Sequence, residues 1–267
     1  MPFHKASSPW WSHTFWSYSV QHVVGALQYL TCTRLDIAFN VHQLCQVMSH
    51  PTTTHFEATK RVLRYIRGTL NFGISFTPVP LTLTAFSNSD WAGDPTDRCF
   101  TTGLLVFLGP NPISWSTKKQ STVSRSLIEA EYRALATTIA ELSWLRTLFK
   151  ELRLYLSHIP VIWCDNVSAI ALFANLVFYS RTKHLEVDYY FTHEKFLRKQ
   201  LQIGFVSGCD NFADIFTKSF SAPLFCSLRS KLLVDSSPIN LRGDVEHSFV
   251  SVKKKPMTKK NKQDEEG

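Results

Sequence analysis

The 267-residue sequence contains no Cys-x-x-Cys pair, and its six cysteines are scattered along the chain. Cys32, His42, Cys45 and His50 have side chains that can bind zinc, but their spacing matches no standard zinc motif. The cysteines also form no pattern typical of a disulfide framework. We therefore expect free, reduced thiols.

A long apolar run is also missing. An uncharged stretch lies between Lys5 and Arg34, but His13, Gln21 and His22 interrupt it, whereas a membrane-spanning helix needs about 20 mainly apolar residues. The N-terminus has no clean apolar core followed by a small-residue cleavage site. These absences predict an intracellular protein, cytoplasmic or nuclear, with no membrane segment. No pattern in the sequence specifies an oligomeric state.

Acidic residues are fewer than basic ones, with 21 Asp and Glu against 29 Lys and Arg, for a net charge of +8. Hydrophobic residues make up 44% of the chain and charged residues 19%, which is typical of a globular protein and excludes a disordered one. Six of the lysines lie in residues 253–267. The basic excess favours a polyanionic partner.

The pattern of apolar residues changes period along the chain. Residues 1–20 show no clear period and are expected to be irregular, whereas helical periodicity covers 21–32, 36–48 and 54–68. Strands are predicted at 72–76, 81–85, 104–108, 113–116, 161–164 and 201–206, and further helices at 124–154, 166–175, 186–199 and 211–218. Residues after Val234 are expected to be disordered. This order predicts an α/β fold with a mixed sheet.

Three acidic residues lie at positions predicted to be buried or beside apolar segments, where an unpaired charge is energetically costly. Glu131 begins the apolar stripe of the long predicted helix, while Glu129 points nearly the opposite way. Asp165 directly follows an apolar strand, where it either caps the next helix or faces a ligand. Asp214 lies between apolar neighbours in a short helix. Together these acids indicate a cation-binding cluster.

Six motifs occur in order along the second half of the chain. They are Ser87-Asn88-Ser89-Asp90-Trp91-Ala92-Gly93-Asp94, Ile113-Ser114-Trp115-Ser116-Thr117-Lys118-Lys119-Gln120, Glu129-Ala130-Glu131-Tyr132-Arg133-Ala134-Leu135, Cys164-Asp165-Asn166, Ser180-Arg181-Thr182-Lys183-His184 and Ala213-Asp214-Ile215-Phe216-Thr217-Lys218. This series resembles the ribonuclease H domain of copia-type LTR retrotransposon polyproteins. The resemblance implies a ribonuclease H-like five-stranded mixed sheet flanked by helices over residues 77–232. Upstream, Thr33-Arg34-Leu35-Asp36-Ile37-Ala38 resembles the stretch that links reverse transcriptase to this domain, which makes residues 21–76 a helical connection segment and 233–267 a Lys-rich tail.

The resemblance implies hydrolysis of the RNA strand of an RNA–DNA hybrid by two Mg²⁺ ions held by four acids. Glu131, Asp165 and Asp214 match three of these acids, but Asn88 stands where the family has the first one. A neutral amide offers one oxygen and no charge, so we expect weakened metal binding and impaired catalysis. Asp90, two residues further along the same strand face, could replace the missing acid only with a bulge or a register shift.

Basic residues supply candidate contacts to hybrid or duplex nucleic acid. The candidates are Lys118 and Lys119, Arg181 and Lys183, and the shared helix face of Lys60, Arg64 and Arg67, for which a solvated charged face is the favoured interpretation. Several other departures from the family, among them Leu35 in place of Pro, are typical of a decaying mobile element. The sequence thus leaves open an impaired ribonuclease H, a non-catalytic nucleic-acid-binding domain, and a relic without function.

Overall fold

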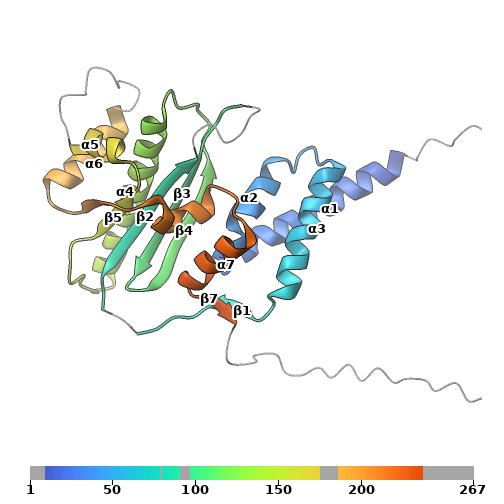
Figure 1. The fold of residues 1–267 in the computed structure, drawn as a ribbon, viewed down its shortest axis with the longest axis horizontal. Coiled ribbons are helices and arrows are strands. Elements are labelled where there is room, and N and C mark those ends of the chain that lie inside the picture. The colour runs from blue at the N-terminus through green and yellow to red at the C-terminus, as the bar shows by residue number, and fades with distance from the viewer. Residues whose placement is uncertain (1–9, 79, 91–96, 175–185, 237–267) are drawn as a thin grey trace, which may run out of the picture. The chain divides into compact units, whose positions relative to one another are not determined.

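The computed structural model describes residues 10–78, 80–90, 97–174 and 186–236 (Figure 1). Their helices, including 3-10 helices labelled η, are α1 (Trp10–Leu30), η1 (Leu35–Ile37), α2 (Ala38–Gln46), α3 (Thr53–Gly68), α4 (Leu127–Glu151), α5 (Val167–Ala174), α6 (Glu186–Leu197), η4 (Gly208–Asp210), η5 (Phe212–Phe216) and α7 (Ala222–Lys231). The strands are β1 (Phe72–Ile74), β2 (Leu83–Asp90), β3 (Thr101–Leu108), β4 (Asn111–Lys119), β5 (Val161–Cys164), β6 (Gln202–Phe205) and β7 (Val234–Ser236). Within the described ranges, no helix is both long and apolar enough to cross a membrane.

Five strands form one mixed sheet in the order β4-β3-β2-β5-β6, which confirms the predicted α/β fold. The hairpin strands β2, β3 and β4 pair antiparallel, whereas β5 pairs parallel with both β2 and β6. Because β2 and β5 are parallel neighbours, their C-terminal ends lie at the same edge of the sheet. The residues that follow these two strands therefore come close together.

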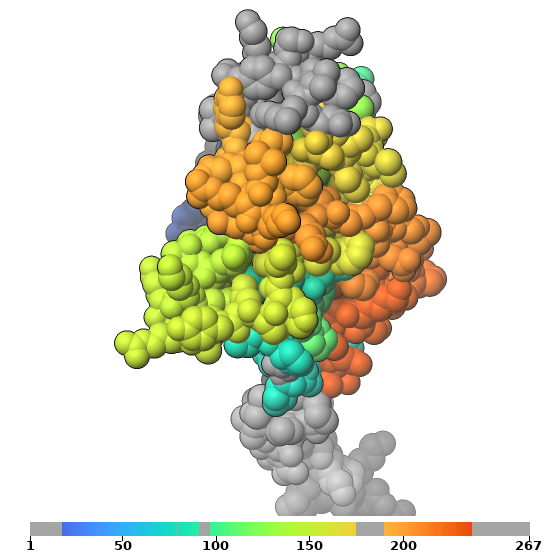
Figure 2. Space-filling model, turned by 90° about the vertical axis from the view of Figure 1, so that its left-hand side faces the viewer, coloured from blue at the N-terminus to red at the C-terminus, as the bar shows by residue number. Residues whose placement is uncertain are grey.

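Alternating residues of the central strands are buried on the two faces of the sheet, because helices cover both. On one face, Ala85 and Val106 pack with the apolar stripe of α4, including Leu135 and Ile139. On the opposite face, Leu105 packs in a second cluster with three groups of residues from other elements. These are Leu35 and Ala38 of the N-terminal segment, Ala213, Ile215 and Phe216 of η5, and Leu228 and Leu232 around α7. Viewed from the side of α5 and α6, α6 and the α4–β5 connection make much of the surface (Figure 2).

The N-terminal helices are tied to the sheet domain by a buried polar network. Arg34 forms an ion pair with Asp36, with 2.7 Å between Nη2 and Oδ2, and donates a second hydrogen bond to the Thr69 carbonyl at 2.8 Å. The Tyr65 hydroxyl donates to Asp36 and lies 3.2 Å from Nη1 of Arg229 in α7. The network therefore joins α3 and α7 around the Arg34–Asp36 pair.

The structure differs from the sequence-based expectations near both ends. Residues 10–20, expected to be irregular, belong to α1, which continues through Gly25 without a proline. β1 pairs with β7 in a separate two-stranded sheet, with Phe72 opposite Ser236, so residues 234–236 are not part of a disordered tail. Residues 237–267 lie outside the described ranges.

Two short helical segments also differ from the expectations. The helix α7 was not predicted. It has a proline in its first turn, and proline is tolerated there although it disrupts the interior of a helix. The segment around Asp214 is a 3-10 helix of five residues, shorter than the helix expected over 211–218.

Candidate functional site

The four positions singled out by the motifs meet at the C-terminal edge of β2 and β5. Asn88 lies near the end of β2, Asp165 follows β5, Glu131 is in the first turns of α4 and Asp214 is in η5. A cleft of about 370 Å³ opens here. It is lined by Asn88, Ser89, Asp90, Leu127, Glu131, Asp165, Asn166, Val167, Ser168, Thr217 and Lys218.

Glu131 is the acid of the cleft whose pKa is raised most strongly. Glu131 is only 3% exposed, and its Oε1 accepts a hydrogen bond from the Ser89 backbone N–H at 3.1 Å. Its other oxygen, Oε2, is buried and has no hydrogen-bond partner among the described residues. Burial, and secondarily the negative charge of Asp165, raise the pKa of Glu131 to about 8. A buried carboxylate oxygen without a donor is the kind of group that a cation satisfies.

Asp165 is not used as a helix cap. The cap of α5 is Asn166, whose Oδ1 accepts a hydrogen bond from the Ala169 N–H at 2.9 Å. The Asp165 side chain therefore remains available to the cleft, which resolves the alternative that the sequence left open. Gly208 passes close to it, because a Cβ added there would lie 3.5 Å from Asp165 Oδ2.

One oxygen or sulfur atom from each of Glu131, Cys164 and Asp165 can lie within 4.8 Å of the others, which is compatible with a metal ion. The Cys164 Sγ accepts a hydrogen bond from the Asn166 N–H at 3.4 Å, and burial raises the pKa of the thiol to about 12. A thiol that keeps its proton is a poor metal ligand, so the two carboxylates are the ligands that this group offers. Carboxylate oxygens suit a hard divalent cation such as Mg²⁺.

Asp214 has both of its oxygens occupied. Oδ1 accepts a hydrogen bond from Asn88 Nδ2 at 2.6 Å, and Oδ2 pairs with the Lys218 ammonium at 2.6 Å. The same Asn88 nitrogen lies 2.6 Å from the Thr217 hydroxyl oxygen. Burial raises the pKa of the Asp214 carboxyl, and Lys218 opposes that rise. Asn88 thus acts here as a hydrogen-bond donor to an acid of the cluster.

Gly103 makes this contact between distant segments possible. It pairs with Asn88 across β2 and β3, directly beneath η5. A Cβ at Gly103 would lie 2.8 Å from the Ala213 carbonyl oxygen and 2.8 Å from the Thr217 Cγ2. Only a residue without a side chain lets η5 lie so close to β3, and η5 carries Asp214 to Asn88.

Asp90 lines the cleft but does not take the place of the missing acid. The pairing of β2 with β3 is continuous from Leu83 opposite Leu108 to Asp90 opposite Thr101, without a bulge in β2. Asp90 therefore stays two residues beyond Asn88 on the strand. It is half-buried, and burial raises the pKa of its carboxyl, with Lys218 opposing the rise.

Glu129, two residues before Glu131, contacts residues around the first turns of α4. Its carboxylate pairs with Arg133 at 2.9 Å and accepts a hydrogen bond from the Arg125 N–H at 2.9 Å. Its own N–H is capped by the Ser126 hydroxyl at 3.2 Å. These contacts hold the first turn of α4 and the segment before it, which orients Glu131.

The predicted basic residues fall into different environments. Lys60 and Arg64 both contact Glu57, at 2.9 Å and 3.8 Å, and Arg67 is exposed. Lys118 is exposed on β4, whereas Lys119 pairs with Asp97 at 2.8 Å. Arg181 and Lys183 lie outside the described residues.

The cation inside the cleft, Lys218, was not predicted as a site residue. Its signal was its place four residues after Asp214 in the last motif, where it can face Asp214 across one helical turn.

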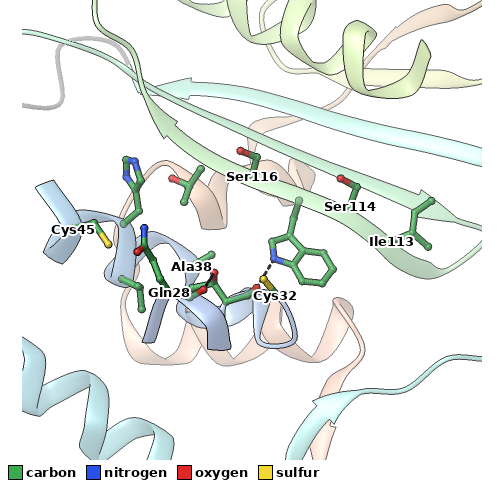
Figure 3. Close-up of a pocket in the computed structure, with 12 residues that line it drawn as sticks. Gln28, Cys32, Ala38, Cys45, Ile113, Ser114 and Ser116 are labelled. Atoms are coloured by element: carbon green, nitrogen blue, oxygen red, sulfur yellow. Dashed lines mark hydrogen bonds between the residues drawn. The ribbon is translucent and has the colours of Figure 1, made fainter. Parts of the chain in front are cut away.

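A second cavity, of about 390 Å³, lies between the N-terminal helices and β4 (Figure 3). Figure 3 shows Cys32 and Cys45 on its helical side and Ser114 and Ser116 on its β4 side. The ring nitrogens of His42, which also lines it, lie 3.3 Å from the Lys119 N–H and 3.2 Å from the Gln46 amide nitrogen. In the described ranges, the group of three clustered metal-binding side chains is the one formed by Glu131, Cys164 and Asp165.

Comparison with known proteins places the chain among transposon sequences. No family model matches it. The retrovirus-related Pol polyprotein from transposon RE2 of Arabidopsis thaliana is 46% identical over 222 residues, which are 83% of this chain and 15% of that protein. The corresponding polyprotein from transposon RE1 of Arabidopsis thaliana is 46% identical over 217 residues, covering 81% of this chain and 15% of that protein. The chain therefore spans 15% of the length of these two relatives.

Among solved structures, the ribonuclease H1 LC11, isolated from compost, aligns with 51% of this chain and 93% of its own at a TM-score of 0.39 and 17% identity.

Proposed function

We propose that this chain, which belongs to the copia-type retrovirus-related Pol family, binds RNA–DNA hybrid through a ribonuclease H-like domain and hydrolyses the RNA strand only slowly. The mixed five-stranded sheet places three acids of the family motifs, and Asn88 in the position of the fourth, around one edge. The function rests on that arrangement.

Three acids have the chemistry to hold a divalent ion in this cleft. Glu131 contributes a buried oxygen without a donor, Asp165 a carboxylate not used as a cap, and Asp214 a carboxylate held by Lys218. A divalent ion bound there would activate water and stabilise the leaving oxygen of the RNA phosphodiester. The Ser89 N–H orients Glu131, and Thr217 with Asn88 orients Asp214.

One observation supports slow hydrolysis. The Asn88 amide nitrogen lies 2.6 Å from both Asp214 Oδ1 and Thr217 Oγ1, so the position of the first-strand acid carries hydrogen-bond donors and no negative charge. A metal ion bound in the cleft would therefore have one charged ligand fewer. Binding to nucleic acid depends on Lys and Arg contacts to phosphates and does not need that ligand.

The test compares cleavage of an RNA–DNA hybrid in Mg²⁺ by the parent chain and by Asn88→Asp. We expect Asn88→Asp to cut about 100-fold faster, because it restores a charged metal ligand. Asn40→Asp, on the exposed side of α2, is the matched control and should cut at the parent rate. Adding Glu131→Gln to Asn88→Asp should abolish the gain. Equal rates for the parent and Asn88→Asp would contradict the proposal.

A non-catalytic binding domain is the second candidate, and the donor role of Asn88 favours it as well. The two are separated by the parent alone: any Mg²⁺-dependent cleavage that Glu131→Gln removes supports the slow enzyme, and hybrid binding in chelator without cleavage in Mg²⁺ supports the binding domain. Absence of hybrid binding at low salt contradicts both.

A further inference from the structure

The acids of the cleft fall into two groups according to what already contacts them. Both oxygens of Asp214 have donors, from Asn88 and from Lys218, each at 2.6 Å. Glu131, in contrast, is only 3% exposed, and its buried Oε2 has no hydrogen-bond donor among the described residues. Glu131 and Asp165 can bring their oxygens within 4.8 Å of each other. The carboxyl oxygen that still lacks a hydrogen-bond donor therefore belongs to Glu131, next to Asp165.

The Lys218 side chain belongs to the cluster. Its ammonium lies 2.6 Å from Asp214 Oδ2, and its side chain lines the same cleft as Glu131 and Asp165. It neutralises the charge of Asp214, and Asn88 contributes no charge. When a bound cation displaces the proton of Glu131, Glu131 and Asp165 carry two negative charges, which one divalent cation balances. A second divalent cation at Asp214 would have to displace the ammonium or lie beside it, and like charges repel strongly at such distances.

We propose that the cleft holds one divalent cation, between Glu131 and Asp165, and that the Lys218 ammonium takes the place of a second cation at Asp214. The inference rests on the proposed function because it concerns the same site. It describes how that site binds ions and makes no statement about the binding of RNA–DNA hybrid. Lys218 is accordingly a positioning residue that holds Asp214 and sets the charge of the cleft. A site that lacks a carboxylate at position 88 needs one positive charge fewer, and the Lys218 ammonium already balances Asp214.

The experiment measures Mn²⁺ binding to the full chain through the loss of the free-ion electron paramagnetic resonance signal, without nucleic acid. We expect one ion per parent chain. Lys218→Met should also bind one ion, but about tenfold more tightly, because a neighbouring positive charge is removed. The double variant Asn88→Asp with Lys218→Met should bind two ions, since it has four acids and no internal cation.

Lys231→Met is the matched control, because the Lys231 side chain is 48% exposed and that of Lys218 is 47% exposed. The Lys231 ammonium lies 3.9 Å from Asp210, which is not an acid of the cleft. This variant should bind Mn²⁺ as the parent does. Lys218→Arg keeps the charge and should also match the parent, which separates loss of charge from loss of fold.

Three results would overturn the inference: two ions per parent chain, no ion at all, or equal affinities for Lys218→Met and Lys231→Met. Each of them leaves hybrid binding in chelator untouched. The failure of this inference is therefore distinguishable from that of the proposed function.

Discussion

Asn88 in β2 donates a 2.6 Å hydrogen bond to Asp214, which lies 126 residues later in η5. An aspartate at position 88 would face the same carboxylate with a like charge and without a hydrogen to donate. The substitution that removes a metal ligand therefore also removes a repulsion from the metal-free protein. Stability and ion binding are opposed at this position.

Asn88→Asp should destabilise the metal-free chain by about 1–3 kcal/mol, because a new carboxylate lies beside Asp214 in a partly buried site. This corresponds to a fall in melting temperature of several degrees. Mg²⁺ should reverse the order of the two proteins, since ion binding stabilises the form that holds the ion more tightly. Four thermal melts, each protein in chelator and in Mg²⁺, check this. A variant that is already the more stable one in chelator would contradict it.

Glu131 should make the metal-free chain less stable as the pH rises. Its pKa is raised to about 8 in the folded chain from an ordinary value of 4.5, so between these values the folded state binds a proton that the unfolded state lacks. The free energy of unfolding then falls with rising pH, by at most about 1.4 kcal/mol per pH unit from this group.

The check is urea denaturation in chelator at several pH values for the parent and for Glu131→Gln. The variant keeps every other titrating group, so the difference between the two slopes isolates Glu131. The parent should lose stability relative to the variant from pH 5 to pH 8. Parallel pH profiles for the two proteins would show that Glu131 does not hold a proton in the folded state.

Gly103→Ala should destabilise the chain by about 1–3 kcal/mol, because the new methyl group meets the backbone of η5 and the structure must shift. Mn²⁺ should still bind at one ion per chain, because the proposed ion lies between Glu131 and Asp165 and not at Asp214. Gly25→Ala is the control, since a Cβ there meets nothing within 4 Å, and in the α1 helix it should be neutral or slightly stabilising. Chemical denaturation and Mn²⁺ titration of both variants measure these effects. Equal stability of the two would contradict the close approach of η5 and β3.

Asp36→Ala should destabilise the chain by about 3–5 kcal/mol, because it leaves the buried guanidinium of Arg34 without its counter-ion. Glu57→Ala, which breaks exposed contacts with Lys60 and Arg64, should leave the stability almost unchanged, because water and salt screen exposed ion pairs. The measurement is the free energy of unfolding from urea denaturation. If both variants lose a similar, small amount, the Arg34–Asp36 pair does not join the N-terminal helices to the sheet domain as described.

Much of the fold could be predicted from the sequence, because local periodicity reflects burial. The strand at Val161–Cys164 was predicted with its observed bounds, and the long helix around Glu131 was predicted to within three residues at each end. The first strand of the sheet was placed too early, at 81–85 in place of Leu83–Asp90, because Ser87, Asn88 and Ser89 are buried polar residues and give no apolar signal.

The amino-acid sequence by itself determined which acids are present, that position 88 carries an amide, and that Glu131 begins a buried helical stripe. Only the tertiary structure decided how these groups contact one another. Asn88 became a donor to Asp214 because Gly103 lets η5 approach the sheet, and Lys218 contacts Asp214 because the turn that follows η5 brings the two side chains together. The pairing of β1 with β7 likewise joins segments that lie far apart in the sequence. Contacts of this kind depend on the packing of distant elements, which leaves no periodic pattern in either segment alone.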